Sequence, residues 1–349
     1  MPFAPLTMSL SFLVSIALLA PAPASADVFD LVAAVSEANL VAHVAALEFD
    51  RSSSAAQALA ADYIRSELES YGYTVVSQPV AGSENLTATL VGLVQPGREF
   101  VLGAHFDTVP GSPGADDNAS SVAAVLEAAR VMAGQPVHST VHFVFFALEE
   151  AGIEGSEAYA AALAAANHSV IGMISLDMIG YTCSTPGCQL VPPDIPGCFD
   201  VDITGNVGEF IGLGANTASQ FMLEALIANA AVYVPSLSIQ TFVVQGNGSC
   251  FSQSRRSDHK SFWDEGYPAI ILSDGAESRN PNYHQASDTL ATLDTAFMTA
   301  VTRAVLAHVA TTVSEAQAVP LLGPAAASVL ALLLGVGGAI AARRRWGVS

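Results

Sequence analysis

Apolar residues recur along the chain with two different spacings. Apolar positions three and four apart predict helices over residues 29–47, 55–68, 120–132, 154–165, 220–230 and 289–313. Ser287 and Asp288 are predicted to cap the last of these helices. Short runs of consecutive apolar residues predict strands over residues 74–76, 85–93, 100–104, 142–147, 170–176 and 269–272. The segment 181–216 follows neither pattern, is rich in Cys, Pro and Gly, and is predicted to be irregular.

Strands that are apolar throughout alternate with helices over most of the chain. This order is typical of an α/β fold with a mostly parallel, mixed central sheet that helices cover on both faces. In such sheets functional groups gather at the carboxyl ends of the strands. His105 and Asp107 follow one predicted strand, Glu149 and Glu150 follow another, and Asp177 follows a third. We therefore expect these side chains at one edge of the sheet.

Both ends of the chain have the composition of targeting segments. Residues 10–20 are apolar and precede a small-residue cleavage site, so residues 1–26 are predicted to be an export signal. Residues 321–342 carry no charge and precede three arginines, which suits one membrane span. The segment 319–349 also resembles bacterial sorting tails of the exosortase type, which a sorting enzyme cuts off after export. A buried helix is the alternative at either end.

The remaining segment, 27–318, is long enough for one catalytic domain with a full core. The net charge of the whole chain is −20, and Lys260 is its single lysine. A surface of this kind repels nucleic acid, which is therefore excluded as a partner, and it suits an exported, soluble protein at the cell surface or outside the cell.

The four cysteines favour an oxidising compartment. Three of them, Cys183, Cys188 and Cys198, lie in the irregular segment, and Cys250 follows later. Two disulfides are predicted, and any of the three pairings is compatible with the spacing. A cysteine zinc cluster is the alternative.

Several polar candidates have an ordinary explanation when each is taken alone. A histidine and an aspartate two residues apart, such as His105 and Asp107, point to the same side of a strand, and the aspartate could orient a metal-bound imidazole. Asp116 and Asp117 precede a helix, where capping is the alternative. The adjacent acids at the end of strand 142–147 are harder to explain, because burying a carboxylate costs solvation free energy.

Six motifs together resemble the exported two-zinc aminopeptidases of the bacterial leucine aminopeptidase type. In chain order they are G-A-H-F-D-T-V-P (103–110), G-A-D-D-N-A-S (114–120), F-F-A-L-E-E-A-G (145–152), L-D-M-I-G-Y (176–181), R-S-D-H (256–259) and N-Y-H-Q-A-S-D-T (282–289). They follow the order of the family. The resemblance implies the zinc-exopeptidase fold, which is phosphorylase/hydrolase-like, and the removal of single residues from peptides that have a free N-terminus.

The same resemblance implies a site for two zinc ions, which cobalt or manganese could replace. His105 and Asp177 would hold one ion, and Glu150 and His284 would hold the other. Asp117 would bridge the two ions. Its neighbour in the sequence, Asp116, is expected to tolerate substitution.

Further roles follow from the resemblance. A hydroxide bridging the two ions would be the nucleophile, and Glu149 would act as the general base. Asp107 would orient the histidine ligand of the first ion, and Tyr283 would stabilise the oxyanion. Arg256 would contact the substrate. The family has glycine where this chain has Ser121, a difference that concerns helix packing.

Other readings remain open within and beyond this fold. A single-zinc glutaminyl cyclase would differ around the Asp-Asp-Asn loop, and a carboxypeptidase would need a basic pocket, for which the chain offers Arg255, Arg256 and Arg279. From a different class, a metal-free surface receptor or adhesin could keep the fold. The segment 183–198 has no counterpart in the family, so the rim of the pocket and the preferred substrate are open.

Two other classes of hydrolase are excluded. Ser257, Asp258 and His259 contain the residue types of a serine-hydrolase triad, but adjacent residues cannot face one another, and the chain has no G-x-S-x-G turn. The absence of an H-E-x-x-H helix motif excludes the common single-zinc proteases.

Overall fold

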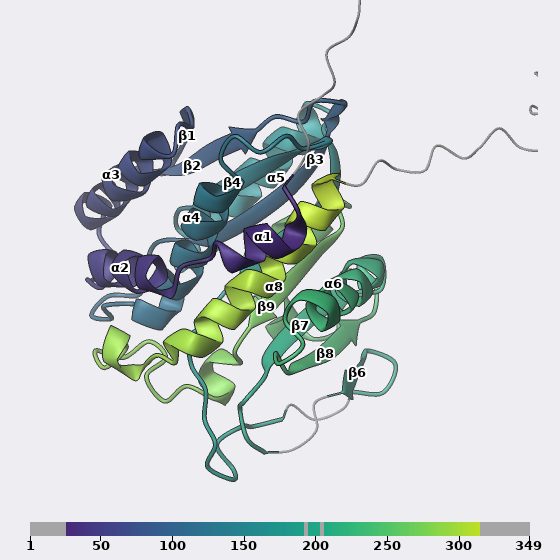
Figure 1. Ribbon diagram of the computed structural model, residues 1–349. Coiled ribbons are helices and arrows are strands. Elements are labelled where there is room, and N and C mark those ends of the chain that lie inside the picture. The colour runs from purple at the N-terminus through teal and green to yellow at the C-terminus, as the bar shows by residue number, and fades with distance from the viewer. Residues whose placement is uncertain (1–25, 192–194, 203–205, 315–349) are drawn as a thin grey trace, which may run out of the picture.

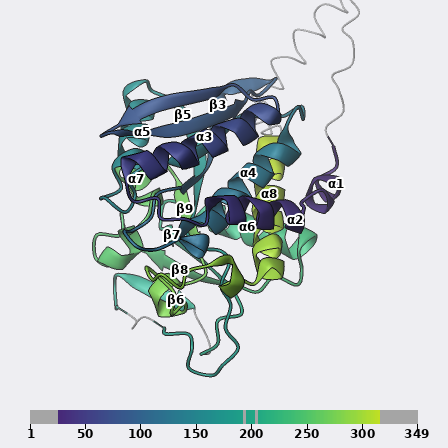
Figure 2. The same ribbon diagram turned by 90° about the vertical axis from the view of Figure 1, so that its left-hand side faces the viewer.

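A nine-stranded mixed sheet forms the centre of the protein, and helices pack on both of its faces (Figures 1 and 2). The computed structural model describes residues 26–191, 195–202 and 206–314. The predicted export signal, except for its last residue, and the predicted tail 319–349 lie outside the described residues.

The strand order is β1-β2-β4-β3-β5-β9-β7-β8-β6. Strands β4, β3, β5 and β9 are parallel to one another and form the middle of the sheet. The prediction of an α/β fold with a mixed sheet is confirmed; the sheet is parallel in the middle, and four of its eight strand pairs are parallel. The strands are β1 (Val75–Val80), β2 (Ser83–Leu90), β3 (Gln95–His105), β4 (Ser139–Phe146), β5 (Ser169–Leu176), β6 (Phe199–Asp202), β7 (Ile211–Asn216), β8 (Ile239–Val244) and β9 (Ala269–Ser273).

Alternate residues of the central strands face two different cores, which explains why these strands are apolar throughout. On β3, Phe100 and Leu102 belong to the larger core, whereas Val101 belongs to the smaller one on the other face. The α-helices are α1 (Val28–Ala33), α2 (Glu37–Leu47), α3 (Ser54–Ser70), α4 (Ser121–Met132), α5 (Glu154–Ala165), α6 (Gln220–Tyr233), α7 (His259–Asp264) and α8 (Thr295–Ser314).

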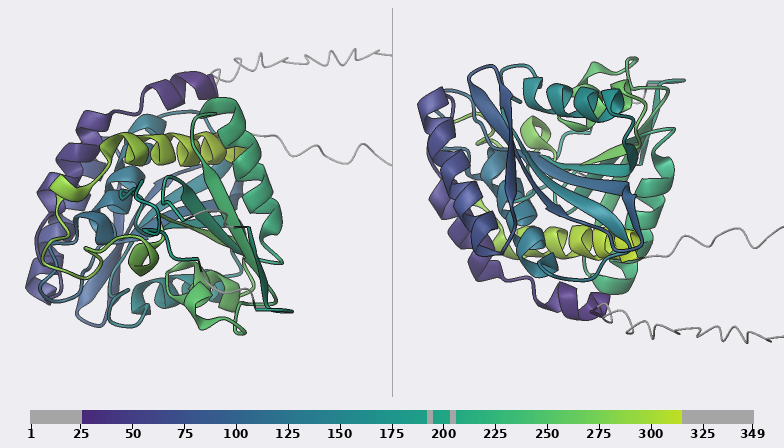
Figure 3. Two further views of the ribbon diagram at one scale, coloured as in Figure 1. Left: turned by 90° about the horizontal axis from the view of Figure 1, so that it is seen from below. Right: turned by 90° about the horizontal axis from the view of Figure 1, so that it is seen from above.

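The two faces of the sheet carry different helices. The larger core takes side chains from α2, α3, α4, α6 and α8, and the smaller core takes them from α5 and α7. Figure 3 shows this division, with the purple N-terminal helices and the yellow α8 on one side of the strands and the teal α5 on the other. Among the described residues only α8 is long and apolar enough to cross a membrane, and 67% of its most apolar window is buried, as in a core helix.

The segment 181–216, predicted to be irregular, contains strands β6 and β7. In β7 two glycines interrupt the apolar pattern on which strand prediction depends. A Cβ atom at Gly214 would lie 2.2 Å from the ring of Phe242 on the neighbouring β8, so packing of that ring requires glycine. The sequence also missed β8 and the short α7.

Two helix boundaries differ from the prediction. Residues 29–47 form two helices, because the Ser36 side chain accepts a hydrogen bond from Asn39 N and starts α2 there. The last helix begins at Thr295, and Asp294 accepts a hydrogen bond from Phe297 N at its start. The predicted cap at residues 287–288 is therefore wrong, and Asp288 has another role, described below.

The four cysteines form the disulfides Cys183–Cys188 and Cys198–Cys250. This outcome confirms the two predicted disulfides, selects one of the three pairings, and rules out the cysteine zinc cluster. Both bridges lie at the edge of the sheet where β5 and β8 end, near the long teal loop at the bottom of Figure 1.

A buried arginine, which the sequence did not single out, joins the connection between α2 and α3 to the chain after β3. The side chain of Arg51 is fully buried and donates to backbone carbonyl oxygens only: Leu47, Phe49, Phe106, Pro113 and Gly114. Burial lowers the pKa of Arg51 to about 10, and nearby carboxylates, Asp117 first among them, oppose this shift. Arg51 therefore remains a cation at neutral pH.

Arg51→Met should lower the free energy of unfolding by about 3 kcal/mol or more, because several buried carbonyl groups lose their donors. Urea unfolding at constant pH measures this change. Arg65→Met is the matched control: Arg65 pairs with Glu84 at 3.0 Å on the partly exposed surface, and an effect below about 1 kcal/mol is expected there. Equal effects of the two substitutions would contradict a structural role for Arg51.

Candidate metal centre

The carboxyl ends of three parallel strands bring the predicted site residues together. His105 is the last residue of β3, Glu150 follows β4, and Asp177 follows β5 directly. Two further residues, Asp117 and His284, come from the loops before α4 and before α8. Together they form two groups of possible metal ligands that share Asp117: His105, Asp117 and Asp177 in one, and Asp117, Glu150 and His284 in the other.

The distances between the ligand atoms suit shared cations. His105 Nε2 lies 3.5 Å from Asp117 Oδ1 and 3.7 Å from Asp177 Oδ1. His284 Nε2 lies 3.1 Å from both Asp117 Oδ2 and Glu150 Oε1. Despite this closeness, neither His284 Nε2 nor Glu150 Oε1 has a hydrogen bond of acceptable geometry. Atoms that share a tetrahedral zinc ion at ~2.0–2.2 Å are separated by roughly 3.3–3.6 Å. The separations here, 3.1–3.7 Å, lie within about 0.2 Å of this range, so the residues fit this metal.

Asp107 fixes the positions of three neighbouring residues. Its Oδ1 accepts a hydrogen bond from Glu149 N at 3.0 Å, and its Oδ2 accepts one from Glu150 N at 3.1 Å. The same carboxylate lies 3.5 Å from Nδ1 of His105, which leaves Nε2 directed at the ligand group. Asp107 thus connects the end of β3 to the acidic loop after β4.

Asp117 is held through its backbone by a carboxylate far away in the sequence. Asp288 accepts hydrogen bonds from Asp116 N at 2.9 Å and from Asp117 N at 3.1 Å. The side chains of Asp116 and Asp117 make no capping bond to the helix that follows, so the capping explanation is wrong for this pair.

Asp116 is a structural residue, contrary to the tolerance expected from the sequence. It is fully buried and accepts hydrogen bonds from Asn280 Nδ2 at 2.7 Å and from Gly180 N at 2.9 Å. Burial, together with the adjacent carboxylate of Asp274, raises the pKa of Asp116 well above its usual range. Substitution would leave these buried donors without a partner.

The ligand groups carry a surplus of negative charge. Burial raises the pKa of Asp117 to about 7. Burial would lower the pKa of His284, but the adjacent carboxylates of Asp117 and Glu150, each 3.1 Å from Nε2, outweigh it and raise the pKa to about 10. Burial would also lower the pKa of His105. Nearby carboxylates, of which Glu149 has the largest effect, outweigh burial and raise this pKa well above its usual value. The carboxylates thus attract positive charge, which divalent cations would supply in place of the protons.

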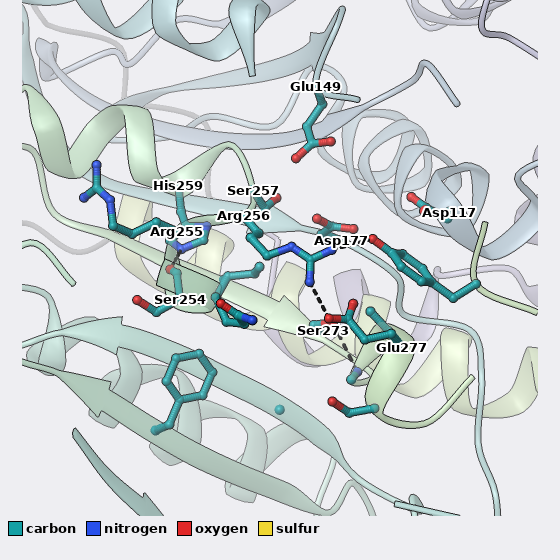
Figure 4. A pocket seen from close by; sticks show the side chains of 18 of the residues that line it. Asp117, Glu149, Asp177, Ser254, Arg255, Arg256, Ser257, His259, Ser273 and Glu277 are labelled. Carbon is teal, nitrogen blue, oxygen red and sulfur yellow. Dashed lines mark hydrogen bonds and ion pairs between the residues drawn. The ribbon is translucent and has the colours of Figure 1, made fainter. Parts of the chain in front are cut away.

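A cavity of about 460 Å³ opens beside the two ligand groups (Figure 4). On its wall the predicted residues Arg256 and Tyr283 meet, because Arg256 Nη2 donates a hydrogen bond of 2.9 Å to the Tyr283 hydroxyl oxygen. Arg256 also pairs with Glu277, and the Tyr283 ring stacks on the ring of His284 with 3.7 Å between centroids. Glu277 was not predicted, since nothing in its local sequence marks it.

The R-S-D-H motif contributes buried residues beside the pocket. His259 Nε2 lies 2.8 Å from Ser254 O, and burial lowers the pKa of His259 to about 4. Asp258 is fully buried, which raises its pKa to about 7. Neither residue belongs to the two ligand groups.

Comparison with known proteins places this geometry in a family. Residues 85–309, more than half of the chain, match peptidase family M28. The chain belongs to this family. Its M28 segment contains all five residues of the two ligand groups, whereas Arg51 lies before it. The fold and the donor set therefore agree with a metallopeptidase of the M28 type.

Individual relatives support the same assignment. The protein YfbL of Escherichia coli (strain K12) is 33% identical over 245 residues, which are 66% of this chain and 72% of YfbL. Leucine aminopeptidase 1 of Ajellomyces capsulatus (strain NAm1 / WU24) is 28% identical over 228 residues, which are 61% of this chain and 52% of that protein. The chain thus spans about half the length of this second relative.

A solved structure has the same fold. The aminopeptidase from Aneurinibacillus sp. strain AM-1 superposes with a TM-score of 0.64 at 17% sequence identity. The match covers 84% of this chain and 98% of the other. It shows that the two proteins share the mixed sheet with helices on both faces.

Asp107→Asn should weaken zinc binding by about 10–100-fold, because an amide cannot accept hydrogen bonds on both sides and leaves the acidic loop and His105 less well oriented. Titration of the metal-free protein with zinc against a competing chelator measures the affinity. Asp62→Asn, an exposed change on α3, serves as the control. An unchanged zinc affinity in Asp107→Asn would contradict the orienting role.

Proposed function

We propose that this M28 protein is an exported zinc-dependent aminopeptidase that hydrolyses the N-terminal peptide bond of peptides. The observation that carries the proposal is the pair of ligand groups that share Asp117, with Glu149 beside them. In the proposal His105 and Asp177 hold one zinc ion, Glu150 and His284 hold the second, and Asp117 bridges them. Bound zinc would polarise the scissile carbonyl group and acidify the attacking water.

Glu149 has the properties that a general base needs. It follows β4, is largely buried, and its backbone N–H is fixed by Asp107. Burial raises the pKa of the Glu149 carboxyl group well above its usual range. A carboxylate of raised basicity can take a proton from the attacking water and return it to the departing amine. Glu149 lies outside both ligand groups, so its oxygens remain available for this transfer.

Tyr283 and Arg256 are placed to act on the developing oxyanion. Arg256 donates to the Tyr283 hydroxyl oxygen, which leaves the phenolic proton free to point into the cavity. Glu277 and the stacked His284 ring restrict the motion of this pair. A donor that is already oriented needs little rearrangement when negative charge develops on the substrate oxygen.

The charges around the cavity favour a free amino terminus over a free carboxylate. The three arginines that a carboxypeptidase could use are all engaged: Arg255 with Asp264 at 2.8 Å, Arg256 with Glu277, and Arg279 with Gln189 at 2.7 Å. Glu149, which lines the cavity and belongs to neither ligand group, would instead attract an ammonium group. The intact ligand set argues against a metal-free receptor or adhesin.

The disulfides fit an oxidising compartment, which agrees with export. We further propose that the segment 319–349 either anchors the exported protein in a membrane or is removed by a sorting enzyme. The mass of the mature protein, isolated from its native host, distinguishes the two fates.

The substrate class can be tested with a panel of reporters. The zinc-loaded protein should hydrolyse aminoacyl-4-nitroanilides, whereas N-acetylated forms of the same compounds should not react. Two zinc ions per chain are expected by elemental analysis. Hydrolysis of N-acetylated reporters would contradict the aminopeptidase proposal, and one zinc ion with cyclisation of N-terminal glutamine would favour a glutaminyl cyclase.

Adjacent glutamates provide a matched test of the roles. Glu149→Gln should keep both zinc ions and lower kcat by about 100-fold or more, since it removes proton transfer but no ligand. Glu150→Gln should instead lower the zinc content. Zinc content and kcat are measured on the same preparations, and full activity of Glu149→Gln would show that another group is the base.

A further inference from the structure

We infer that Leu190, which follows the Cys183–Cys188 loop and lines the pocket, forms a wall for the side chain of the substrate's N-terminal residue and selects a large apolar one. This inference rests on the proposed function and deepens it. It assigns a role to the segment between β5 and β6, for which the sequence offered no counterpart in the family.

The cavity beside the ligand groups has large apolar side chains in its lining, together with polar ones such as Gln253 and Ser254. Six large apolar side chains line it: Ile153, Leu190, Phe210, Phe242, Phe251 and Ile271. A cavity that combines metal ligands with several large apolar side chains fits a molecule whose reacting group is polar and whose side chain is not. The free volume, about 460 Å³, accommodates an aromatic or branched aliphatic side chain.

Leu190 differs from the other apolar lining residues in its exposure. Its side chain is 63% exposed although it faces a cavity, whereas Phe210 beside it is only 3% exposed. A single exposed leucine is ordinary on a protein surface. At the mouth of a cavity, however, an exposed leucine gains apolar contact when a substrate side chain enters, and this gain favours large apolar residues.

The segment that carries Leu190 is fixed before any substrate binds. The disulfide between Cys183 and Cys188 closes a loop that ends two residues before Leu190, and Cys183 exchanges two backbone hydrogen bonds with Gly208, at 3.0 and 2.7 Å. Leu190 N donates to Ser278 O at 2.8 Å. The backbone of Leu190 is therefore held from two sides, so its side chain is a wall and not a mobile flap.

Arg279 joins this wall to the rest of the pocket. It is nearly fully buried, and its Nε donates to Gln189 Oε1 at 2.7 Å, immediately before Leu190. Its Nη1 donates to Phe210 O at 2.7 Å, and the guanidinium group lies 4.4 Å from the centre of the Phe210 ring. A Cβ atom at Gly208 would lie 2.3 Å from Arg279 Nε, so this approach requires glycine.

The wall is also connected to the metal centre. Asn280, next to Arg279 in the chain, donates to Asp116 at 2.7 Å, and Asp116 precedes the shared ligand Asp117. Two buried hydrogen bonds, Arg279 to Gln189 and Asn280 to Asp116, together with the chain between these neighbours, thus set the distance between the wall and the metal ligands. A pocket of fixed depth discriminates between side chains by size more sharply than a mobile one.

Leu190→Ala tests the wall, and Leu93→Ala is a closely matched control. Leu93 is also 63% exposed but lies in the connection between β2 and β3, outside the pocket. With leucyl- and phenylalanyl-4-nitroanilide, kcat/KM of zinc-loaded Leu190→Ala should fall about tenfold, mainly through a higher KM. With alanyl-4-nitroanilide the change should stay within about twofold. Leu93→Ala should leave all three values unchanged.

A second variant tests the support of the wall. The double substitution Cys183→Ser and Cys188→Ser opens a loop of sequence separation 5, which constrains the unfolded chain less than a longer loop would. The thermal midpoint should therefore fall by about 5 °C or less and the zinc content should stay unchanged, whereas KM for the leucyl substrate should rise as in Leu190→Ala. An unchanged KM would show that Leu190 does not depend on the disulfide and would overturn that part of the inference.

The outcomes separate this inference from the proposed function. Hydrolysis with no preference for leucyl over alanyl substrates, or an equal loss for both in Leu190→Ala, overturns the wall but leaves the aminopeptidase intact. If the wild type cleaves none of the reporters, the proposed function fails, and calorimetric titration with free L-leucine and L-alanine tests the wall directly. About tenfold weaker binding of L-leucine to Leu190→Ala is then expected, and equal binding by the two proteins overturns the inference.

Discussion

The repulsion between buried carboxylates is the constraint on which the rest of the structure depends. Five carboxylates gather near the carboxyl ends of three parallel strands: Asp107, Asp117 and Glu149 are buried, and Glu150 and Asp177 are partly buried. Two unit charges 4 Å apart interact by about 4 kcal/mol at an effective dielectric constant of 20. The raised pKa values of Asp117 and Glu149 express this repulsion together with their burial. Such an arrangement persists only if the fold supplies compensating positive charge and hydrogen-bond donors.

The compensation comes from groups that do not themselves belong to the ligand groups. Arg51 places a buried cation beside the loop that bears Asp117, and it holds that loop through carbonyl oxygens so that no carboxylate is consumed. Asp107 accepts a hydrogen bond from the backbone N–H of Glu149, and Asp288 accepts one from the backbone N–H of Asp117. These hydrogen bonds fix the carboxylates against their repulsion, and bound divalent cations would complete the neutralisation.

The sequence predicted the elements whose pattern is local. Strand ends and motif spacing located His105, Glu149 and Asp177, because an apolar run followed by a polar group is visible within a few residues. Arg51 could not be predicted, since its partners are carbonyl groups that carry no sequence signal. The difference between Asp116 and Asp117 is likewise set by partners over 160 residues away, Asn280 for Asp116 and His284 for Asp117. Strand β7 was missed because two glycines, one of them required by Phe242, interrupted its apolar pattern.

Buried arginines shape the pocket as well as offsetting the charge of the carboxylates. Buried arginines hold its two margins: Arg51 holds the metal-ligand loop, and Arg279 holds the segment that carries Leu190. Both are engaged and buried, so neither offers its charge to a substrate. A ligand whose ammonium group lies near Glu149 and whose side chain lies against the large apolar residues of the lining suits both parts of the cavity. A ligand that brings a carboxylate to those apolar residues would lose its hydration without gaining a cationic partner.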